Sequence, residues 1–489
     1  MSGILILLVA VPLMTAFLLS VTALPQKVPH TTLMKLRNVL SVSGMGVLCV
    51  ILAVCAPAAL SGHVLTYTVG GWSPFLGVAL RLDAFSFSLV VVSVLVCFLA
   101  LFYSIPHMGY MRRMGKYDAF YFLMVAGIVG VFLTRDIFNM YVFFEILSIS
   151  VFVLITAGEK KESYKASLKY LILASLSSAL FLFAVGIIYA SCGSLNMDYA
   201  AEGMKSMVEE NPELMYVVFT LLLVSLGVKT SIVPLHFWLP DAHSIAPTPI
   251  SAILSGIILK VSIYAMVRLF LLCGWQFYSE VSPIIAYTGA ATVAVGTLLA
   301  LVQKDIKRML AYSSISQIGI IVTGIGIGTD LALQGALFHV VNHALMKSGL
   351  FLCAGIIAGQ SRTREISKLQ MGAPGVAVSF VVLSLGIIGV PPLNGFVSKF
   401  IICYGAVQAQ YSGLAFIILA ASVLSCGYYF RVIQAFFKKK KRRKKTPMYR
   451  VSRFMSFPVY ILAVLCVILG LFPLIGLQIA DLALKMVGG

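Results

Sequence analysis

Residues 227–240 read Gly227-Val-Lys-Thr-Ser-Ile-Val-Pro-Leu-His-Phe-Trp-Leu-Pro240, an apolar stretch that contains one lysine and two prolines. Proline removes a backbone donor and clashes with the preceding turn, so we expect any helix through this stretch to break. A second stretch, residues 389–399, combines two adjacent prolines with a lysine in the same way. Within a membrane, such freed backbone groups are tolerated only where they face protein or a watery cavity.

The composition of the whole chain places both stretches in a membrane. Of the 489 residues, 60% are hydrophobic and 11% are charged, and the mean hydropathy is +1.01. Soluble globular proteins carry about 25% charged residues, which excludes an ordinary cytosolic enzyme. A helix needs about 20 mostly apolar residues to cross the hydrocarbon layer, and by that measure we predict an all-α protein with fourteen spans. Their approximate ranges are 3–24, 37–60, 83–105, 117–134, 137–157, 164–190, 214–235, 246–272, 282–303, 308–328, 331–358, 374–407, 412–437 and 454–475.

Basic residues concentrate in every second loop between these spans. By the positive-inside rule these loops face the cytoplasm, and both termini face the outer side of a cell membrane. The first span is expected to be an uncleaved anchor, because no basic residue precedes it as in a signal peptide. The loop at 236–246 is the exception to the charge pattern. The basic residues are Lys27, Lys35, Arg37, Arg112, Arg113, Lys116, Lys160, Lys161, Lys165, Lys304, Lys307, Arg308, Arg362, Arg364, Lys368, a run from Lys438 to Lys445, Arg450 and Arg453.

The net charge of +19 is therefore mostly a consequence of topology. Nucleic-acid binding is not expected, because the chain has no aqueous domain that would carry a basic surface with aromatic platforms. The run from Lys438 to Lys445 is interpreted as a signal that fixes the last hairpin. Binding of anionic lipid or of an acidic partner subunit is the alternative for this run.

The cysteines give no sign of a cofactor. All nine are scattered, without a C-x-x-C motif or a close Cys/His cluster, so an iron–sulfur cluster, a c-type haem and a zinc knuckle are not expected. Two histidines at 339 and 343 lie one turn apart on the same predicted helix, so they cannot face each other across a haem. We therefore expect neither a cofactor nor a metal.

The charges inside the spans are the informative ones. A charge at the bilayer centre costs about 2.5–3.5 kcal/mol on the insertion scale, so such residues are functional candidates. Glu145 is the one acidic residue well inside an apolar run, whereas Lys229, Lys260, Lys347 and Lys399 all lie inside spans. One acid cannot pair four lysines. Burial favours the neutral amine and a nearby carboxylate favours the ammonium, so a lysine whose partner moves away becomes a proton donor.

His339, His343 and Lys347 follow one another at i, i+4 and i+8, so they share one helix face. Two histidines at that spacing resemble half a zinc site, but no glutamate stands between them and a lysine follows. A row of titratable groups suits proton hopping, because a neutral imidazole can take a proton on one nitrogen and release it from the other. Satisfied core histidines are the structural alternative.

The two interrupted spans are five spans apart, so they cross the membrane in opposite directions. Paired broken helices in inverted repeats point to an ion site at the midplane. Three stretches, residues 229–243, 304–319 and 339–347, resemble the antiporter-like subunits shared by respiratory complex I, Mrp-type multisubunit Na⁺/H⁺ antiporters and membrane-bound energy-converting hydrogenases.

This resemblance implies a fourteen-helix subunit with two inverted five-helix repeats, each containing a broken helix. We expect a three-helix segment at 1–112, repeats at 113–272 and 282–437, and a basic cytoplasmic loop with a final helix at 438–489. By position, Glu145 and Lys229 match a switchable ion pair, Lys260 a connecting lysine, His339 and His343 a relay, and Lys399 the terminal lysine. Length and Lys399 favour the D-type antiporter protein or its hydrogenase equivalent, and a complex I subunit is the alternative.

The functional hypothesis is a proton-translocating subunit that moves H⁺, alone or coupled to Na⁺, and performs no bond-making chemistry itself. Other membrane subunits and lipid are the expected partners. A polytopic membrane enzyme is the alternative from another class, and it would need a catalytic cluster near one membrane surface. His236, Asp241 and His243 form the single candidate for such a cluster, and they equally suit a proton entrance.

Overall fold

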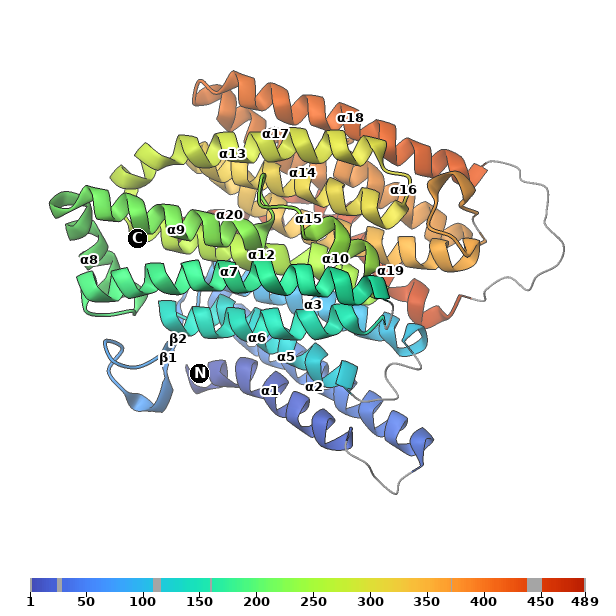
Figure 1. The fold of residues 1–489 in the computed structure, drawn as a ribbon, viewed down its shortest axis with the longest axis horizontal. Helices are drawn as coiled ribbons and strands as arrows, with labels where there is room; N and C mark the ends of the chain where they lie inside the picture. The colour runs from blue at the N-terminus through green and yellow to red at the C-terminus, as the bar shows by residue number, and fades with distance from the viewer. Residues whose placement is uncertain are drawn as a thin grey trace.

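A computed structural model of the chain describes residues 2–23, 29–108, 116–158, 161–370, 372–437 and 451–487. Within these ranges the protein is a bundle of helices that lie roughly alongside one another (Figure 1). The first half contains η1 (Ser2–Ile4), α1 (Leu5–Thr22), α2 (His30–Leu60), α3 (Ala84–His107), α5 (Lys116–Leu133), α6 (Ile137–Thr156), α7 (Lys161–Cys192), α8 (Met197–Glu210), α9 (Pro212–Thr230), α10 (Leu239–Ile245), α11 (Thr248–Ile253), η3 (Leu254–Ile258) and α12 (Leu259–Leu272). The second half contains α13 (Trp275–Val302), α14 (Ile306–Gly326), α15 (Asp330–Ser361), η4 (Ile366–Lys368), α16 (Pro374–Ile388), α17 (Asn394–Gln408), α18 (Ser412–Phe437), α19 (Arg453–Leu471) and α20 (Pro473–Val487).

The predicted span count is confirmed. Thirteen stretches of described helix are long and apolar enough to cross a membrane, and none of them covers the twelfth predicted span. That span is formed by α16 and α17, which are each 15 residues long because the helix is interrupted between them. The chain is therefore a multi-pass membrane protein, whose described residues contain thirteen candidate spans and the divided helix pair α16 and α17.

Both predicted interruptions are present. The helix α9 ends at Thr230, where Ser231 adopts a left-handed conformation with φ 62°, and helical structure resumes at α10. The helix α16 ends at Ile388 and is followed by Gly389, whose φ of 92° is open to glycine at little steric cost. The chain then passes through the proline pair before α17 begins. Each half of the molecule thus contains one broken helix, as the two-repeat architecture requires, while the residue boundaries of the repeats stay a prediction.

The centre of the bundle is formed by α14, α15 and the segment Thr248–Leu272, which are almost entirely buried. Helices α13 and α14 pack closely because glycines line their contact. A Cβ on Gly326 would lie 2.1 Å from the backbone nitrogen of Ala286, a distance at which one helix would have to move. Small residues allow such close approach of helices in membranes. The helix α14 also packs on the central helix α15.

Three features of the fold were not expected. Strands β1 (Leu65–Thr68) and β2 (Ala79–Leu82) form an antiparallel hairpin in which Leu65 pairs with Leu82, with the short η2 (Val69–Gly71) between them. The loop between the predicted spans 164–190 and 214–235 contains α8, whose methionines face the core. The final segment holds two helices rather than one, because the chain bends at Phe472 and α20 starts at Pro473.

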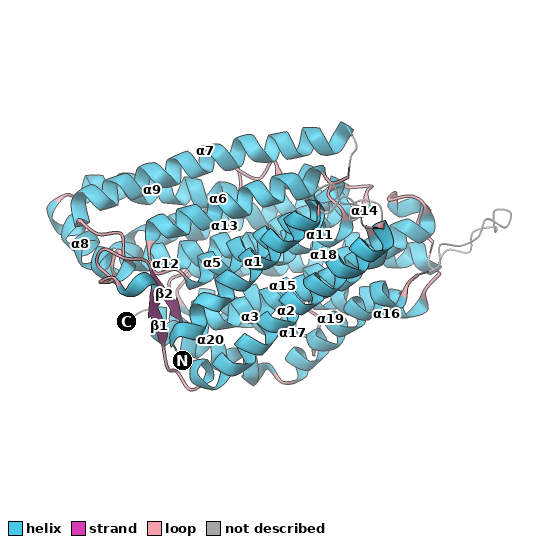
Figure 2. Cartoon of the chain, turned by 90° about the horizontal axis from the view of Figure 1, so that it is seen from below, coloured by secondary structure: helices cyan, strands magenta, loops and turns pink. Residues whose placement is uncertain are grey.

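The hairpin, α8, the start of α1 and the end of α20 all lie at the same end of the bundle (Figure 2). An even number of crossings requires this placement of the two ends of the chain. Several basic residues assigned to the other side lie outside the described residues, and these are Lys27, Arg112, Arg113, Lys160, the run from Lys438 to Lys445, and Arg450.

Candidate functional site

Glu145 and Lys229 are brought together through a serine. The hydroxyl of Ser178 on α7 donates to Oε1 of Glu145 on α6, and Nζ of Lys229 on α9 donates to Oγ of Ser178 at 3.1 Å. Among the described ion pairs there is none that joins Glu145 directly to Lys229. The predicted pair therefore exists as a three-member network, in which one neutral hydroxyl connects the carboxylate to the amine.

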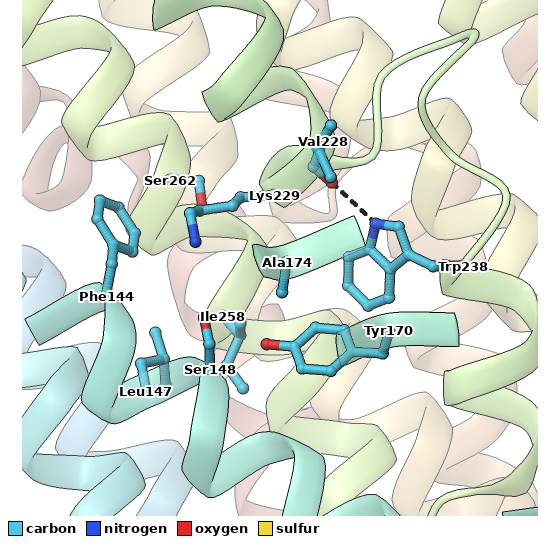
Figure 3. A pocket seen from close by; sticks show the side chains of 10 residues that line it. All are labelled: Phe144, Leu147, Ser148, Tyr170, Ala174, Val228, Lys229, Trp238, Ile258 and Ser262. Carbon is cyan, nitrogen blue, oxygen red and sulfur yellow. Dashed lines mark hydrogen bonds between the residues drawn. The ribbon is translucent and has the colours of Figure 1, made fainter. Parts of the chain in front are cut away.

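Lys229 lies beside a cavity at the break in α9. Its amine is 5.0 Å from the centre of the Phe144 ring, and it points into the same space as the hydroxyl of Tyr170 (Figure 3). The indole of Trp238 donates to the carbonyl of Val228 at 2.8 Å, which satisfies one of the backbone groups that the break leaves free. The far wall of the cavity is formed by Ile258 and Ser262. These two residues lie one turn apart on the helix face opposite to Lys260, so the helix that carries Lys260 also lines this cavity.

Lys260 lies directly after a π-helical segment. Such segments are rare and occur frequently at functional sites, because they displace carbonyls from the regular ladder. The amine of Lys260 donates to the carbonyl of Ser255 at 2.5 Å. Gly256, one turn before Lys260, packs on α15, where a Cβ on this glycine would overlap Ser348. The irregular segment thus places Lys260 against the central helix.

The two histidines on α15 are stacked, with ring centres 6.1 Å apart and planes inclined by 20°. Nδ1 of His339 lies 2.8 Å from Oγ of Ser398, and Nε2 lies 3.1 Å from Oε1 of Gln317. Both nitrogens of His343 are buried without a hydrogen-bond partner among the described residues. The two histidines therefore lie on one face of α15, and Ser398, which contacts His339, directly precedes Lys399 in the chain.

Lys347 and Lys399 are both buried and are both held by neutral acceptors. Lys347 donates to the carbonyl of Leu310 at 3.1 Å and to the hydroxyl of Tyr429 at 3.2 Å. Lys399 donates to the carbonyls of Ile387 and Ile388 at 2.6 and 3.3 Å. Its third acceptor is Oγ of Ser422 at 3.2 Å. The two carbonyls belong to the last turn of α16, which the break leaves without helical donors.

The three residues at 236, 241 and 243 do not converge. His243 is fully buried between the rings of Trp238 and Phe351, with centres 6.3 and 5.7 Å away. Asp241 instead forms surface ion pairs with Lys169 at 2.8 Å and Arg308 at 3.3 Å. Within the described residues no group of three His, Cys, Asp or Glu side chains could hold a metal ion. The catalytic metal cluster that a membrane enzyme would need is thus not assembled by this trio.

A second charged cluster escaped the sequence reasoning. Arg268 on α12 donates to Asp83, the N-cap of α3, and both side chains are buried. Burial alone would raise the pKa of Asp83, but the charge of Arg268 and the backbone N–H of Ser86 outweigh it and hold that pKa below its ordinary value. Asp83 was overlooked because it is the first residue of its predicted span and not well inside it. Arg268 was inside a predicted span, and its charge was the available signal.

The helix α14 carries one more buried cation. Lys307 donates to the carbonyl of Ala246 at 2.9 Å and lies 3.3 Å from Oγ of Ser251. It was counted as a loop residue, because the predicted tenth span started after it. Its contacts fix the start of α11 against α14.

Comparison with known proteins places this fold and site in a family. Residues 134–425 match the family described as NADH:quinone oxidoreductase/Mrp antiporter, transmembrane. The N-type chain of the NADH-quinone oxidoreductase of Desulforudis audaxviator is 34% identical over 96% of this chain and 95% of its own length. The D-type chain of the Na⁺/H⁺ antiporter of Bacillus subtilis is 31% identical over 96% and 94%.

Solved structures have the same fold. A chain of the Mrp complex from a Dietzia species superposes with a TM-score of 0.90 at 23% identity, covering 100% of this chain and 97% of its own. A chain of an archaeal membrane-bound sulfane sulfur reductase gives 0.89 at 29% identity, covering 99% and 97%. With a family match across most of its spans and relatives that align over nearly its whole length, this chain belongs to the NADH:quinone oxidoreductase/Mrp antiporter family of membrane subunits.

Proposed function

We propose that the chain is a proton-translocating, antiporter-like subunit of a larger membrane complex, moving H⁺ alone or coupled to Na⁺. The observation that carries the proposal is the set of four buried or partly buried lysines, each held by hydroxyls or carbonyls instead of a carboxylate. A lysine with neutral acceptors can exist as an ammonium or as an amine without leaving an opposite charge buried and unpaired, which is the expensive case.

Glu145 acts on the first of these lysines. When Ser178 connects the two groups, the carboxylate favours the ammonium form of Lys229. When the connection is lost, burial favours the neutral amine and Lys229 releases its proton. The cavity beside Lys229 is lined by Ile258 and Ser262 of the helix that carries Lys260, and we infer that water between the two lysines completes the step.

From Lys260 the proton passes to the histidine row and then to Lys399. His343 is within electrostatic range of Lys260, Lys347 and Lys399, and His339 contacts Ser398 beside the terminal lysine. His343 has unused nitrogens that can bind water or a proton. We infer that His236, Asp241 and His243 serve the entrance, with Asp241 at the surface and His243 inside.

The family members suggest the assembly in which this happens. The relatives are named as subunits of an antiporter and of a quinone oxidoreductase, and the superposed chains come from multisubunit membrane complexes. We infer that other membrane subunits are partners of this chain in the cell membrane. The basic loops predict that both termini lie outside.

The test uses everted vesicles from cells that contain the whole complex. Glu145→Gln and Lys229→Ala should each abolish proton transport, measured by the quenching of a ΔpH-sensitive acridine dye, without reducing the amount of assembled complex. Glu209→Gln and Lys205→Ala are matched controls, because both residues are exposed on α8. Transport at the control rate in both site variants would refute the proposal.

The same vesicles separate the two branches of the family. The slightly higher identity to the oxidoreductase chain than to the antiporter chain keeps a role in NADH-quinone oxidoreductase as a second candidate. Proton uptake driven by NADH would assign the chain to that branch. Collapse of a preformed ΔpH on addition of Na⁺ would assign it to the antiporters.

A further inference from the structure

Two buried asparagines join the central helix α15 to the second half of the broken span. Nδ2 of Asn342 on α15 donates to the backbone carbonyl of Asn394 at 3.1 Å, and Nδ2 of Asn394 donates to Oδ1 of Asn342 at 3.0 Å. Asn394 is the first residue of α17, directly after the break, and both side chains are fully buried. Two hydrogen bonds between the same two groups fix their orientation as well as their distance. The pair therefore holds the first turn of α17 against α15.

The backbone carbonyl of Asn394 receives a second donor. The hydroxyl of Ser398, one turn further along α17, lies 3.3 Å from this carbonyl oxygen and 2.8 Å from Nδ1 of His339. It also approaches the carbonyl of Gly395, at 3.4 Å. A hydroxyl carries one proton, so Ser398 directs it either to the backbone or to the imidazole. Because Asn342 holds the carbonyl of Asn394 in place, it also sets the position of the hydroxyl relative to the imidazole.

These contacts lie where the histidine row meets the terminal lysine. Ser398 directly precedes Lys399 in the chain, and Asn342 lies between His339 and His343 on α15. The asparagine pair and the contact between His339 and Ser398 thus join the same turn of α15 to the first turn of α17. A shift of α17 along α15 would separate the hydroxyl from the imidazole, although each residue would stay in its own helix.

We propose that Asn342 and Asn394 are positioning residues for the step of the proposed route between His339 and Lys399. Their two bonds hold the hydroxyl of Ser398 at hydrogen-bond distance from the imidazole. Neither asparagine carries the proton itself, because a side-chain amide is not among the groups that titrate in proteins. The inference rests on the proposed function, and it adds to that function the residues that align α15 with α17.

The test measures proton flux through the purified, complete complex in proteoliposomes, with an imposed pH gradient and pyranine inside. Asn342→Ala and Asn394→Ala should each lower the flux per assembled complex by roughly tenfold, because a displacement of about 1 Å can slow a reaction up to about 100-fold. Gln334→Ala is the matched control and should keep the wild-type flux. This amide also lies on α15, but it donates to the carbonyl of Leu477 on α20, away from the row.

A paired replacement separates positioning from stability. Asn342→Leu with Asn394→Leu exchanges both amides for apolar side chains of the same branched shape. Such a replacement of both partners is nearly neutral for stability, so the complex should assemble in normal amount and keep its thermal unfolding temperature, even if the single alanine variants do not assemble. The flux should still fall by roughly tenfold, because nothing then aligns Ser398 with His339. Wild-type flux in this double variant would overturn the inference.

A second combination shows whether the pair acts through Ser398. Ser398→Ala removes the hydroxyl that the pair positions, and it should itself lower the flux. Adding Asn342→Ala to Ser398→Ala should then cost less than about twofold, because changes that act through one shared group are not additive. A further tenfold loss in the Ser398→Ala background would show that the pair does not act through the hydroxyl.

The inference and the proposed function fail in different ways. If all variants of the asparagine pair match the flux of Gln334→Ala while Glu145→Gln still abolishes it, the positioning role is refuted and proton transport stands. If neither wild type nor Gln334→Ala transports protons, the proposed function itself fails.

Discussion

The serine between Glu145 and Lys229 provides the sharpest test of how the two charges communicate. Ser178→Ala removes one hydroxyl that donates to the carboxylate and accepts from the amine at 3.1 Å. The substitution leaves both charges in place. It therefore asks whether the carboxylate influences the lysine through this hydroxyl or through space.

The expected loss follows from the bond that the lysine makes. A hydrogen bond to a charged group contributes about 1.5–3 kcal/mol. If this bond is needed while the proton is transferred, its loss slows transport by roughly 10- to 150-fold, since about 1.4 kcal/mol corresponds to a factor of ten. Ser178 is buried, with 4% of its surface exposed, so bulk water does not replace the hydroxyl readily.

The assay is proton uptake by everted vesicles, normalised to the amount of assembled complex. Ser177→Ala is the matched control, because the neighbouring serine pairs with Ser225 instead. Ser178→Thr retains a hydroxyl and should recover most of the rate. Uptake by Ser178→Ala equal to that of Ser177→Ala would show that the hydroxyl does not connect the charges.

Three other predictions concern stability. Arg268→Met removes the buried arginine from Asp83 and leaves it only the longer contact with Arg81 at 3.7 Å. The change should lower the free energy of unfolding by about 3–5 kcal/mol, measured as thermal unfolding of the detergent-solubilised complex, and Asp83→Asn should restore part of the loss. The pKa of Asp83 is below its ordinary value. The ionised carboxylate therefore contributes its full stabilisation above the ordinary carboxyl pKa of about 4, and this contribution is lost as the pH falls through the lowered pKa. The thermal unfolding temperature of Asp83→Asn should accordingly depend less on pH below about 4 than that of wild type. Gly326→Ala inserts a Cβ 2.1 Å from the nitrogen of Ala286 and should cost about 1–3 kcal/mol in the same melt, whereas Gly186→Ala, with nothing within 4 Å, should be neutral.

Most of the architecture followed from composition and from proline. Apolar length alone located thirteen spans, and Pro391 with Pro392 predicted why the twelfth is divided into two short helices. The helix α8 was not expected, because its exposed acidic face hides the helical spacing of its buried methionines. The hairpin is only four residues per strand, which is too short for a clear alternation.

The sequence predicted which residues form the candidate site, but it did not predict the hydrogen bonds between them. Periodicity placed His339 and His343 on one face, since both lie on a single uninterrupted helix. The serine between Glu145 and Lys229 comes from a third helix, and no spacing within one helix reveals a contact of that kind. His243 was assigned to a loop near the surface, although the short helix α10 carries it into the interior. The sequence therefore does not reveal which residues of separate helices lie at the same depth in the membrane and contact one another.

The way in which Lys399 closes the break in its own span has a mechanical consequence. An ammonium has three N–H donors, and the structure offers it three acceptors, two of them the last carbonyls of α16. The neutral amine has one donor fewer, so its formation leaves one acceptor at this depth without a partner. The backbone between α16 and α17 must then adjust or admit water. The protonation state of Lys399 and the backbone conformation of the interrupted span are thus coupled, so that a change in one requires a change in the other.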